Sequence, residues 1–297
     1  MERHQGMADA GRDEVGGMVL EAWDAFIDEV AAVDLDRPSR LSGWRAHEIA
    51  VHLGCWDDHT ALADLIASAR SGGIGTPPEV DAVNARVTAA HRNASRDEVL
   101  AALRRNRDAT ARYLKEEPVE LDTAPTVSVV GRLPLLSVVL GQAYELAVHG
   151  LDLVSCGSEP PPPSVLQTGL AALADVTGAL AASCDIAGGV TLATPDGGWG
   201  FAADGDGWTV HREPSGWMSG PAVEASAPLL LEAASGRINP VPAAATRRLK
   251  VHDVAGLLVL APIVQKVPGI PGGPILQLAA RTMGGAGGML GRLFRRG

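Results

Sequence analysis

The feature that most constrains this chain is a long apolar segment, residues 133–156, that carries acidic and imidazole side chains but no Lys or Arg. Read as a helix, the segment places Glu145, His149 and Asp152 on one face, because they are spaced four and three residues apart. A carboxylate and an imidazole on a largely buried helix need a counter-charge, and a divalent metal ion binds both. The pattern predicts half of a metal site. The alternative is the solvated face of an exposed helix, although the narrow polar arc without Lys or Arg favours the metal site.

The remaining ligands are expected in the first third of the chain. Residues 45–70 read as a helix that follows Ser42-Gly43-Trp44, and His52 lies on its apolar face. A core histidine with satisfied nitrogens gives the same pattern, so that alternative stays open. Together with Glu145 and His149, His52 forms a two-His, one-carboxylate set. Such a set leaves a coordination position open for water or substrate, as in catalytic zinc sites.

Two motifs resemble those of a known family. Leu41-Ser42-Gly43-Trp44, followed by His52-Leu53, resembles the opening motif of the mycothiol-dependent maleylpyruvate isomerase family, and residues 145–153 resemble its second motif, E-x-x-x-H-x-x-D-L. The family belongs to the DinB/YfiT-like superfamily of metal-binding four-helix bundles. The resemblance implies that the ligands are His52, Glu145 and His149, with zinc as the usual metal. It implies that Asp152 lies behind the ligands or in the substrate pocket, where it is a candidate catalytic residue.

Four other residues are candidates for the pocket. Asn84 stands where family members often have an Asn entering the third helix, as a pocket residue or a cap. His59, two turns past His52, is a candidate general base, and Cys55 is a candidate fourth ligand or nucleophile, or a small buried hydrophobe. Tyr144 precedes the motif glutamate, where many members carry Arg. If that Arg binds an anionic substrate, its absence argues against maleylpyruvate itself.

The expected fold class is two-domain, a helical bundle followed by a small α+β domain. The run Pro160–Pro163 is a stiff linker, and the pattern becomes strand-like from Gly189. We predict a DinB-like four-helix bundle over residues 1–158, the linker and a connecting helix over 159–188, a small α+β domain over 189–266 and a flexible Gly/Pro-rich tail over 267–297. The third of these is similar to the sterol-carrier-like C-terminal domain found in many of these isomerases.

Hydrophobic periodicity and turn residues locate the individual elements. We expect helices over 15–33, 45–70, 79–117 in two pieces, 133–156 and 164–183. Ser95 is the expected N-cap of the second piece of the third helix. Asp-Gly turns separate strand-like runs at 190–192, 199–201 and 208–210, which is typical of hairpins. A helix over 228–235, a strand over 249–251 and a helix over 254–264 complete the expected α+β domain.

Composition excludes several functional classes. A chain of 297 residues suffices for one large or two ordinary domains. The formal net charge of −10 argues against a nucleic-acid partner. Cys55, Cys156 and Cys184 are too scattered for a disulfide framework. Residues 1–14 lack an apolar signal core, and the strongly apolar run near 254–264 is too short to span a bilayer. We expect a cytoplasmic monomer or homodimer without a membrane partner.

The resemblance implies an enzyme that requires zinc and mycothiol. Zinc with an open position lowers the pKa of the mycothiol thiol, and the thiolate adds to an electrophilic small molecule. An adduct that rotates and expels the thiol gives cis–trans isomerisation of the maleylpyruvate type, whereas a persistent adduct gives S-transfer. One alternative is a non-catalytic small-molecule-binding protein whose metal site is structural or vestigial. Another is a zinc hydrolase with His59 or Asp152 as its general base.

Overall fold

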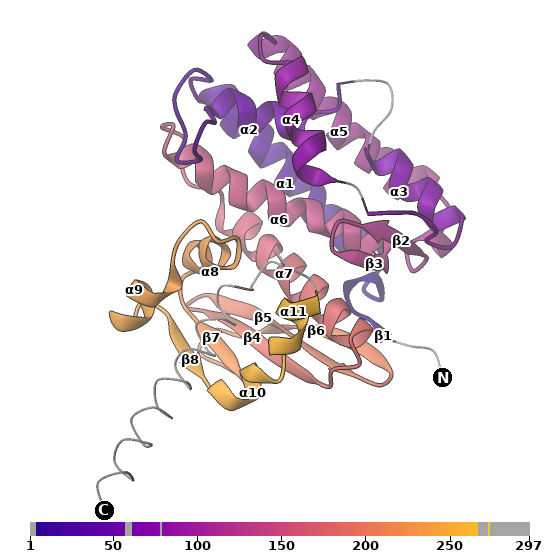
Figure 1. Ribbon diagram of the computed structural model, residues 1–297, viewed down its shortest axis with the longest axis vertical. Helices are drawn as coiled ribbons and strands as arrows, with labels where there is room; N and C mark the ends of the chain where they lie inside the picture. The colour runs from indigo at the N-terminus through magenta and orange to yellow at the C-terminus, as the bar shows by residue number, and fades with distance from the viewer. Residues whose placement is uncertain (1–3, 57–60, 78, 267–272, 274–297) are drawn as a thin grey trace, which may run out of the picture. The chain divides into compact units, whose positions relative to one another are not determined.

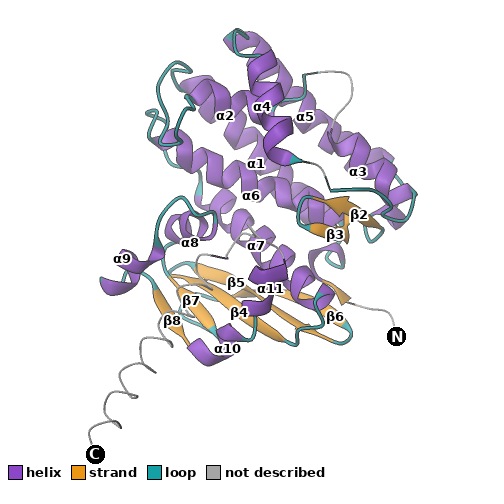
Figure 2. Ribbon diagram, viewed as in Figure 1, coloured by secondary structure: helices purple, strands orange, loops and turns teal. Residues whose placement is uncertain are grey.

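The computed structural model describes residues 4–56, 61–77, 79–266 and 273 (Figure 1). Internal contacts divide the chain into two compact units, one of residues 7–172 and one that combines residues 1–6 with 173–297. The first unit is mostly helical, and the second contains a six-stranded sheet (Figure 2). The predicted mixture of helical and sheet structure is confirmed. The domain boundaries at residues 158, 188 and 266 stay a prediction.

Long helices packed side by side form the helical unit. In chain order its helices are α1 (Arg12–Ala32), α2 (Ala46–Leu53), α3 (Ala61–Arg70), α4 (Val80–Ala90), α5 (Arg96–Glu116), α6 (Leu135–Val154) and the beginning of α7 (Pro163–Ser183), with short 3₁₀ turns at Gly6–Ala8 and Val119–Leu121. α1 packs against α5 and α6, and α2 packs against α4 and α5. Trp23, Phe26, Ile49, Leu103 and Leu140 are fully buried among these helices. Burying each such side chain contributes about 1.5–3 kcal/mol to folding.

The start of α5 confirms a sequence prediction. The side chain of Ser95 accepts a hydrogen bond from the backbone N–H of Glu98, and the Glu98 side chain accepts one from the backbone N–H of Ser95. This reciprocal capping box satisfies two backbone donors that the first helical turn leaves without partners.

The prediction of one helix over residues 45–70 is wrong, because α2 ends at Leu53 and α3 begins at Ala61. Two hydrogen bonds, one to α5 and one from the side chain of Trp56, explain why the helix is interrupted after Leu53. The backbone N–H of Cys55 donates to the carbonyl of Ala102 at 3.0 Å, and the indole N–H of Trp56 donates to the carbonyl of Val51 at 2.8 Å. These bonds replace the hydrogen bonds that a continuous helix would make.

A hairpin that the sequence did not reveal precedes α6. β2 (Pro125–Ser128) and β3 (Gly131–Pro134) pair antiparallel, and Gly131 has a φ of 122°, which suits glycine. Pro134 then caps α6, so this helix begins at Leu135 rather than at residue 133. Strands of four residues are too short to leave a periodic pattern.

The second unit is built on a mixed sheet with the strand order β1-β6-β5-β4-β7-β8. Its strands are β1 (His4–Gln5), β4 (Gly188–Thr194), β5 (Gly197–Asp204), β6 (Gly207–Glu213), β7 (Ala222–Glu224) and β8 (Lys250–His252). Tight turns join β4 to β5 and β5 to β6 in antiparallel pairs, which confirms both predicted hairpins. β1 pairs parallel with β6, and β7 pairs parallel with β4.

Helices accompany this sheet. They are the end of α7, α8 (Ala227–Ala234), α9 (Pro240–Ala245), α10 (Val254–Leu258) and α11 (Ala261–Lys266). A Cβ at Gly178 of α7 would lie 2.6 Å from the ring of Trp208 and 3.1 Å from that of Phe201, so α7 packs closely on the sheet face that carries these rings. The helix predicted over 254–264 is divided into α10 and α11, and the predicted flexible tail lies outside the described residues except for residue 273.

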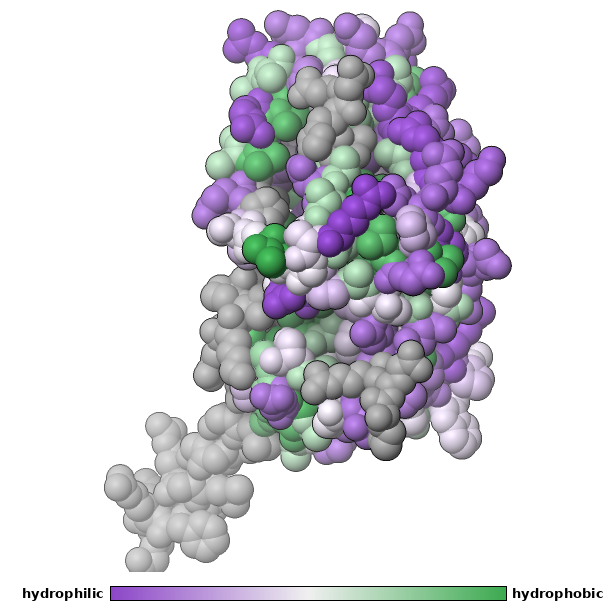
Figure 3. All heavy atoms as spheres, turned by 90° about the vertical axis from the view of Figure 1, so that its right-hand side faces the viewer, coloured by the Kyte–Doolittle hydropathy of each residue, from purple (hydrophilic) through white to green (hydrophobic). Residues whose placement is uncertain are grey.

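One helix in the described part of the chain, α7, is long and apolar enough to cross a membrane by length and composition. In its most apolar window, 83% of α7 is buried inside the structure, as in the core helix of a folded domain. On the face drawn in Figure 3, hydrophilic residues predominate over the helical unit, as expected for helices with their apolar sides inward.

Candidate metal centre

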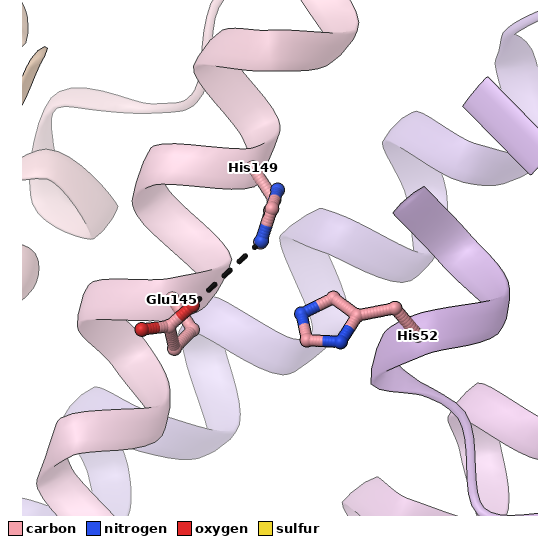
Figure 4. A group of neighbouring side chains, drawn as sticks. All are labelled: His52, Glu145 and His149. Atoms are coloured by element: carbon pink, nitrogen blue, oxygen red, sulfur yellow. Dashed lines mark ion pairs between the residues drawn. The ribbon is translucent and has the colours of Figure 1, made fainter. Parts of the chain in front are cut away.

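Two helices of the helical unit bring three potential metal ligands together. One ligand atom each from His52 of α2 and from Glu145 and His149 of α6 lie within 4.8 Å of one another (Figure 4). Glu145 and His149 are one helical turn apart, and α2 faces them with His52. Thus the three residues selected from the sequence meet in space.

The imidazole of His149 lies between two carboxylates. Its Nδ1 lies 2.9 Å from Oδ2 of Asp152, and its Nε2 lies 3.7 Å from Oε2 of Glu145. The two groups lie at ion-pair distance but are not aligned for a hydrogen bond, so Asp152 favours a proton on Nδ1 through its charge, which places the ring lone pair on Nε2. The side chain of Glu145 is 52% exposed and that of His149 only 5%, so the cluster opens to solvent on the Glu145 side.

His52 is oriented in a similar way from a third helix. Its Nδ1 lies 3.1 Å from Oδ1 of Asn84 on α4. An amide oxygen only accepts, so this contact also favours the Nδ1–H tautomer, which places the ring lone pair on Nε2. Asn84, selected from the sequence as a pocket residue or a cap, therefore contacts one of the three cluster residues.

Trp44 packs against both histidines. Its ring centroid lies 5.5 Å from that of His52, and these two rings meet edge-on. The centroids of Trp44 and His149 are 6.4 Å apart, and these two rings are nearly parallel. The two imidazoles are 5.0 Å apart. The sequence placed Trp44 in the first motif, but that motif gave no indication of its position over the histidines.

Two other carboxylates in the helical unit have opposite pKa shifts. Burial raises the pKa of Glu29, on α1, to about 8. A Cβ at Gly150 would lie 2.7 Å from Oε2 of Glu29, and this buried oxygen has no hydrogen-bond partner in the described part of the chain. Burial also acts to raise the pKa of Glu48, but hydrogen bonds from Arg45 outweigh it and lower that pKa to about 2. The Arg45–Glu48 pair fixes the first turn of α2, the helix that carries His52.

The donor set fits a divalent metal ion. Two imidazoles with oriented Nδ1 atoms and one accessible carboxylate are the ligand types that zinc takes, and the carboxylate or amide partner behind each histidine is typical of metal sites. Among the described residues, the side chains that form the cluster are His52, Glu145 and His149.

Comparison with known families finds a match for the region that carries this cluster. Residues 19–154 match the family of the mycothiol maleylpyruvate isomerase N-terminal domain. This region, a little under half of the chain, is similar to that family. The matched region runs from α1 to the end of α6 and includes His52, Glu145 and His149.

Solved structures were compared as well. The mycothiol-dependent maleylpyruvate isomerase and a mutant of it each match with 17% identity and a TM-score of 0.49, over 79% of this chain and 93% of theirs. The curated proteins give no match.

The other candidates in the helical unit are placed differently. Tyr144 is buried on α6, about 100° around the helix from Glu145. Cys55 is buried just after α2 and is not one of the three clustered ligands. His59, the candidate general base, lies outside the described residues.

Arg40 is the residue that sequence reasoning missed. Its Nε donates to Oδ1 of Asp152 at 2.7 Å, although the two residues are 112 positions apart. The absence of Lys and Arg near Asp152 in the sequence therefore does not mean that this carboxylate lacks a cation. No local pattern contains this pairing, because it depends on how the loop before α2 packs on α6.

Proposed function

We propose that this chain is a metal- and mycothiol-dependent enzyme, with zinc as the metal, in which the thiolate of mycothiol adds to an electrophilic small molecule. The observation that carries the proposal is the cluster of His52, Glu145 and His149 inside a domain of the mycothiol maleylpyruvate isomerase family. Three such donors leave a coordination position open. A zinc ion bound there would lower the pKa of a coordinated thiol, so that the nucleophile exists at neutral pH.

The chain's own residues prepare the site in this proposal. Asp152 and Asn84 favour protons on the Nδ1 atoms of His149 and His52, which places the ring lone pairs on Nε2, the atoms that would bind the metal. Trp44 covers the two imidazoles and excludes water from the side it occupies. The half-exposed Glu145 marks the side from which thiol and electrophile enter.

The fate of the adduct decides the reaction. In isomerisation a C–S bond forms, the former double bond rotates, and the C–S bond breaks with release of the thiol; in S-transfer the C–S bond remains. The family match supports isomerisation, so we place cis–trans isomerisation of the maleylpyruvate type first and S-transfer second. Tyr144 stands where many members have Arg, so the electrophile is to be identified by screening.

Two other functions receive less support. A zinc hydrolase needs a general base, and Asp152 is fully buried between Arg40 and His149, which suits orientation of His149 better than proton exchange with a substrate. A structural metal site in a binding protein would recruit a fourth protein ligand such as Cys55 or His59. Among the described residues Cys55 is not part of the cluster, and His59 lies outside the described residues. We propose small molecules as the only partners, in a cytoplasmic monomer or homodimer.

Metal content is the first test. We expect about one zinc per chain in the purified wild type, and loss of zinc with retained helical circular dichroism in His52→Ala, Glu145→Ala and His149→Ala. His91→Ala is the matched control, because His91 stacks on Trp56 in the same unit and is outside the cluster. Full occupancy in any ligand variant removes that residue from the site.

Thiol dependence is the second test. We expect the wild type to convert an electrophile such as a cis-configured unsaturated 2-oxo acid only when mycothiol is added, and His149→Ala to be inactive. Activity without thiol would favour the hydrolase. A wild type that binds no zinc even after reconstitution would favour the binding protein.

A further inference from the structure

Arg40 connects the loop between α1 and α2 to the end of α6. Its guanidinium donates to Asp152, and its backbone N–H donates to Oγ of Ser155 at 3.0 Å. Ser155 in turn donates to the backbone carbonyl of Asp152 at 2.8 Å. Arg40 thus holds the last turn of α6 through both its side chain and its main chain.

Asp152 transmits this contact to His149. One carboxylate oxygen, Oδ1, accepts from Arg40 at 2.7 Å, and the other, Oδ2, lies 2.9 Å from Nδ1 of His149. The side chain of Asp152 is 0% exposed, whereas that of Arg40 is 28% exposed. A carboxylate removed from water needs a positive partner, and the planar guanidinium fixes its orientation as well as its charge.

We propose that Arg40 is a positioning residue of the metal centre: by fixing Asp152, it fixes the ring orientation and the Nδ1–H tautomer of His149. The inference rests on the proposed function only in that the metal uses Nε2 of His149. The effect on the tautomer is a property of the metal-free protein too. Without Arg40, Asp152 loses the 2.7 Å contact at Oδ1, so Oδ2 is held less firmly opposite Nδ1.

Zinc affinity measures the first consequence. We would determine the Kd for zinc of the full chain by chelator competition at one pH, for wild type, Arg40→Gln, Arg40→Lys and Asp152→Asn. We expect Asp152→Asn to raise the Kd roughly 10- to 100-fold, less than the loss of a ligand, and Arg40→Gln to raise it roughly 3- to 10-fold. Arg40→Lys keeps the positive charge but lacks the planar guanidinium, so its Kd for zinc should lie between those of wild type and Arg40→Gln.

A double variant tests the route. If Arg40 acts through Asp152, adding Arg40→Gln to Asp152→Asn changes the Kd by less than about twofold, because the two substitutions break one chain of contacts. An additional loss equal to that of Arg40→Gln alone would show that Arg40 acts elsewhere and would overturn the proposal.

Arg107→Gln is the matched control. Arg107 of α5 donates to Asp24 of α1 at 2.9 and 3.1 Å, so this variant also loses an Arg–carboxylate pair of the helical unit. We expect wild-type zinc affinity for it. If Arg107→Gln and Arg40→Gln weaken zinc binding equally, the effect is general destabilisation and not positioning.

Nitrogen NMR of the metal-free protein provides a readout that needs no zinc. The ¹⁵N shifts of the His149 imidazole should show the Nδ1–H tautomer in wild type and in Arg107→Gln. In Arg40→Gln we expect a mixture of tautomers. An unchanged tautomer together with an unchanged Kd overturns the inference. A wild type that binds no zinc refutes the proposed function, and the NMR result then decides the role of Arg40 by itself.

Discussion

The indole of Trp44 lies nearly parallel to the imidazole of His149, with 10° between the ring planes and 6.4 Å between their centroids. The same indole meets His52 edge-on. One aromatic side chain from the loop before α2 therefore contacts histidines from two different helices. A charged ion bound between these histidines would change the electrostatic environment of the indole.

Zinc binding should consequently change tryptophan fluorescence through Trp44. A divalent charge close to the indole alters its emission, so we expect Trp44→Phe to abolish most of the zinc-dependent fluorescence change while zinc still binds. Trp217→Phe is the control, because Trp217 is 64% exposed and belongs to the other unit. A full signal in Trp44→Phe would contradict the placement of the metal beside this ring.

Removal of the Asn84 amide should weaken zinc binding without abolishing it. Asn84 orients His52 from α4, and loss of such a partner costs roughly tenfold in metal affinity. We expect this increase in Kd for Asn84→Ala and none for Asn93→Ala, a substitution in the exposed turn after α4. Equal affinities of the two variants would show that His52 needs no support from α4.

The stability of the protein should depend on Glu29 between about pH 5 and pH 8. The pKa of Glu29 is about 8 in the folded chain, against about 4.3 for an unperturbed Glu. In this window the unfolded chain releases the proton that the folded chain keeps, so the free energy of unfolding falls as pH rises.

Glu29→Gln removes this dependence. We expect the variant to be more stable than wild type at pH 8 by at least about 1 kcal/mol, with a smaller difference at pH 5. Urea unfolding at both pH values measures it, and Asp28→Asn on the exposed side of α1 is the control. A wild type and a Glu29→Gln variant with parallel pH profiles would contradict the raised pKa.

The capping box of α5 should contribute measurably to stability. Ser95→Ala removes the hydroxyl that accepts the backbone N–H of Glu98, which should cost about 1 kcal/mol in urea unfolding. Ser95→Asp retains an acceptor at the N-cap, and we expect it to be close to wild type. If both variants unfold at the same urea concentration, the cap does not stabilise this helix.

Local patterns were enough to predict much of the fold. Amphipathic spacing located most of the helices, Ser95 located the start of α5, and the Asp-Gly turns located two hairpins. The break after Leu53 was not predictable, because it depends on bonds between residues 55–56 and partners such as Ala102 on α5. A strand of two residues, such as β1, has no periodic pattern at all.

The candidate site divides in the same way. Glu145 and His149 share a helix face and could be paired from their spacing, and His52 was selected from the apolar face of another predicted helix, a choice that the motif resemblance supported. Arg40 and the position of Trp44 could not be predicted, because the loop that carries them reaches α6 only through tertiary packing.

The parallel pairing of β1 with β6 has a consequence for dissecting the protein. His4 and Gln5 pair with Gly207 and Trp208, so the strand that covers the β6 edge precedes the whole helical unit in the chain. A fragment that begins after the polyproline run would leave this edge of the sheet bare and prone to pairing with another chain. In sequence terms the helical unit is an insertion, and excising the sheet unit intact requires both ends of the chain.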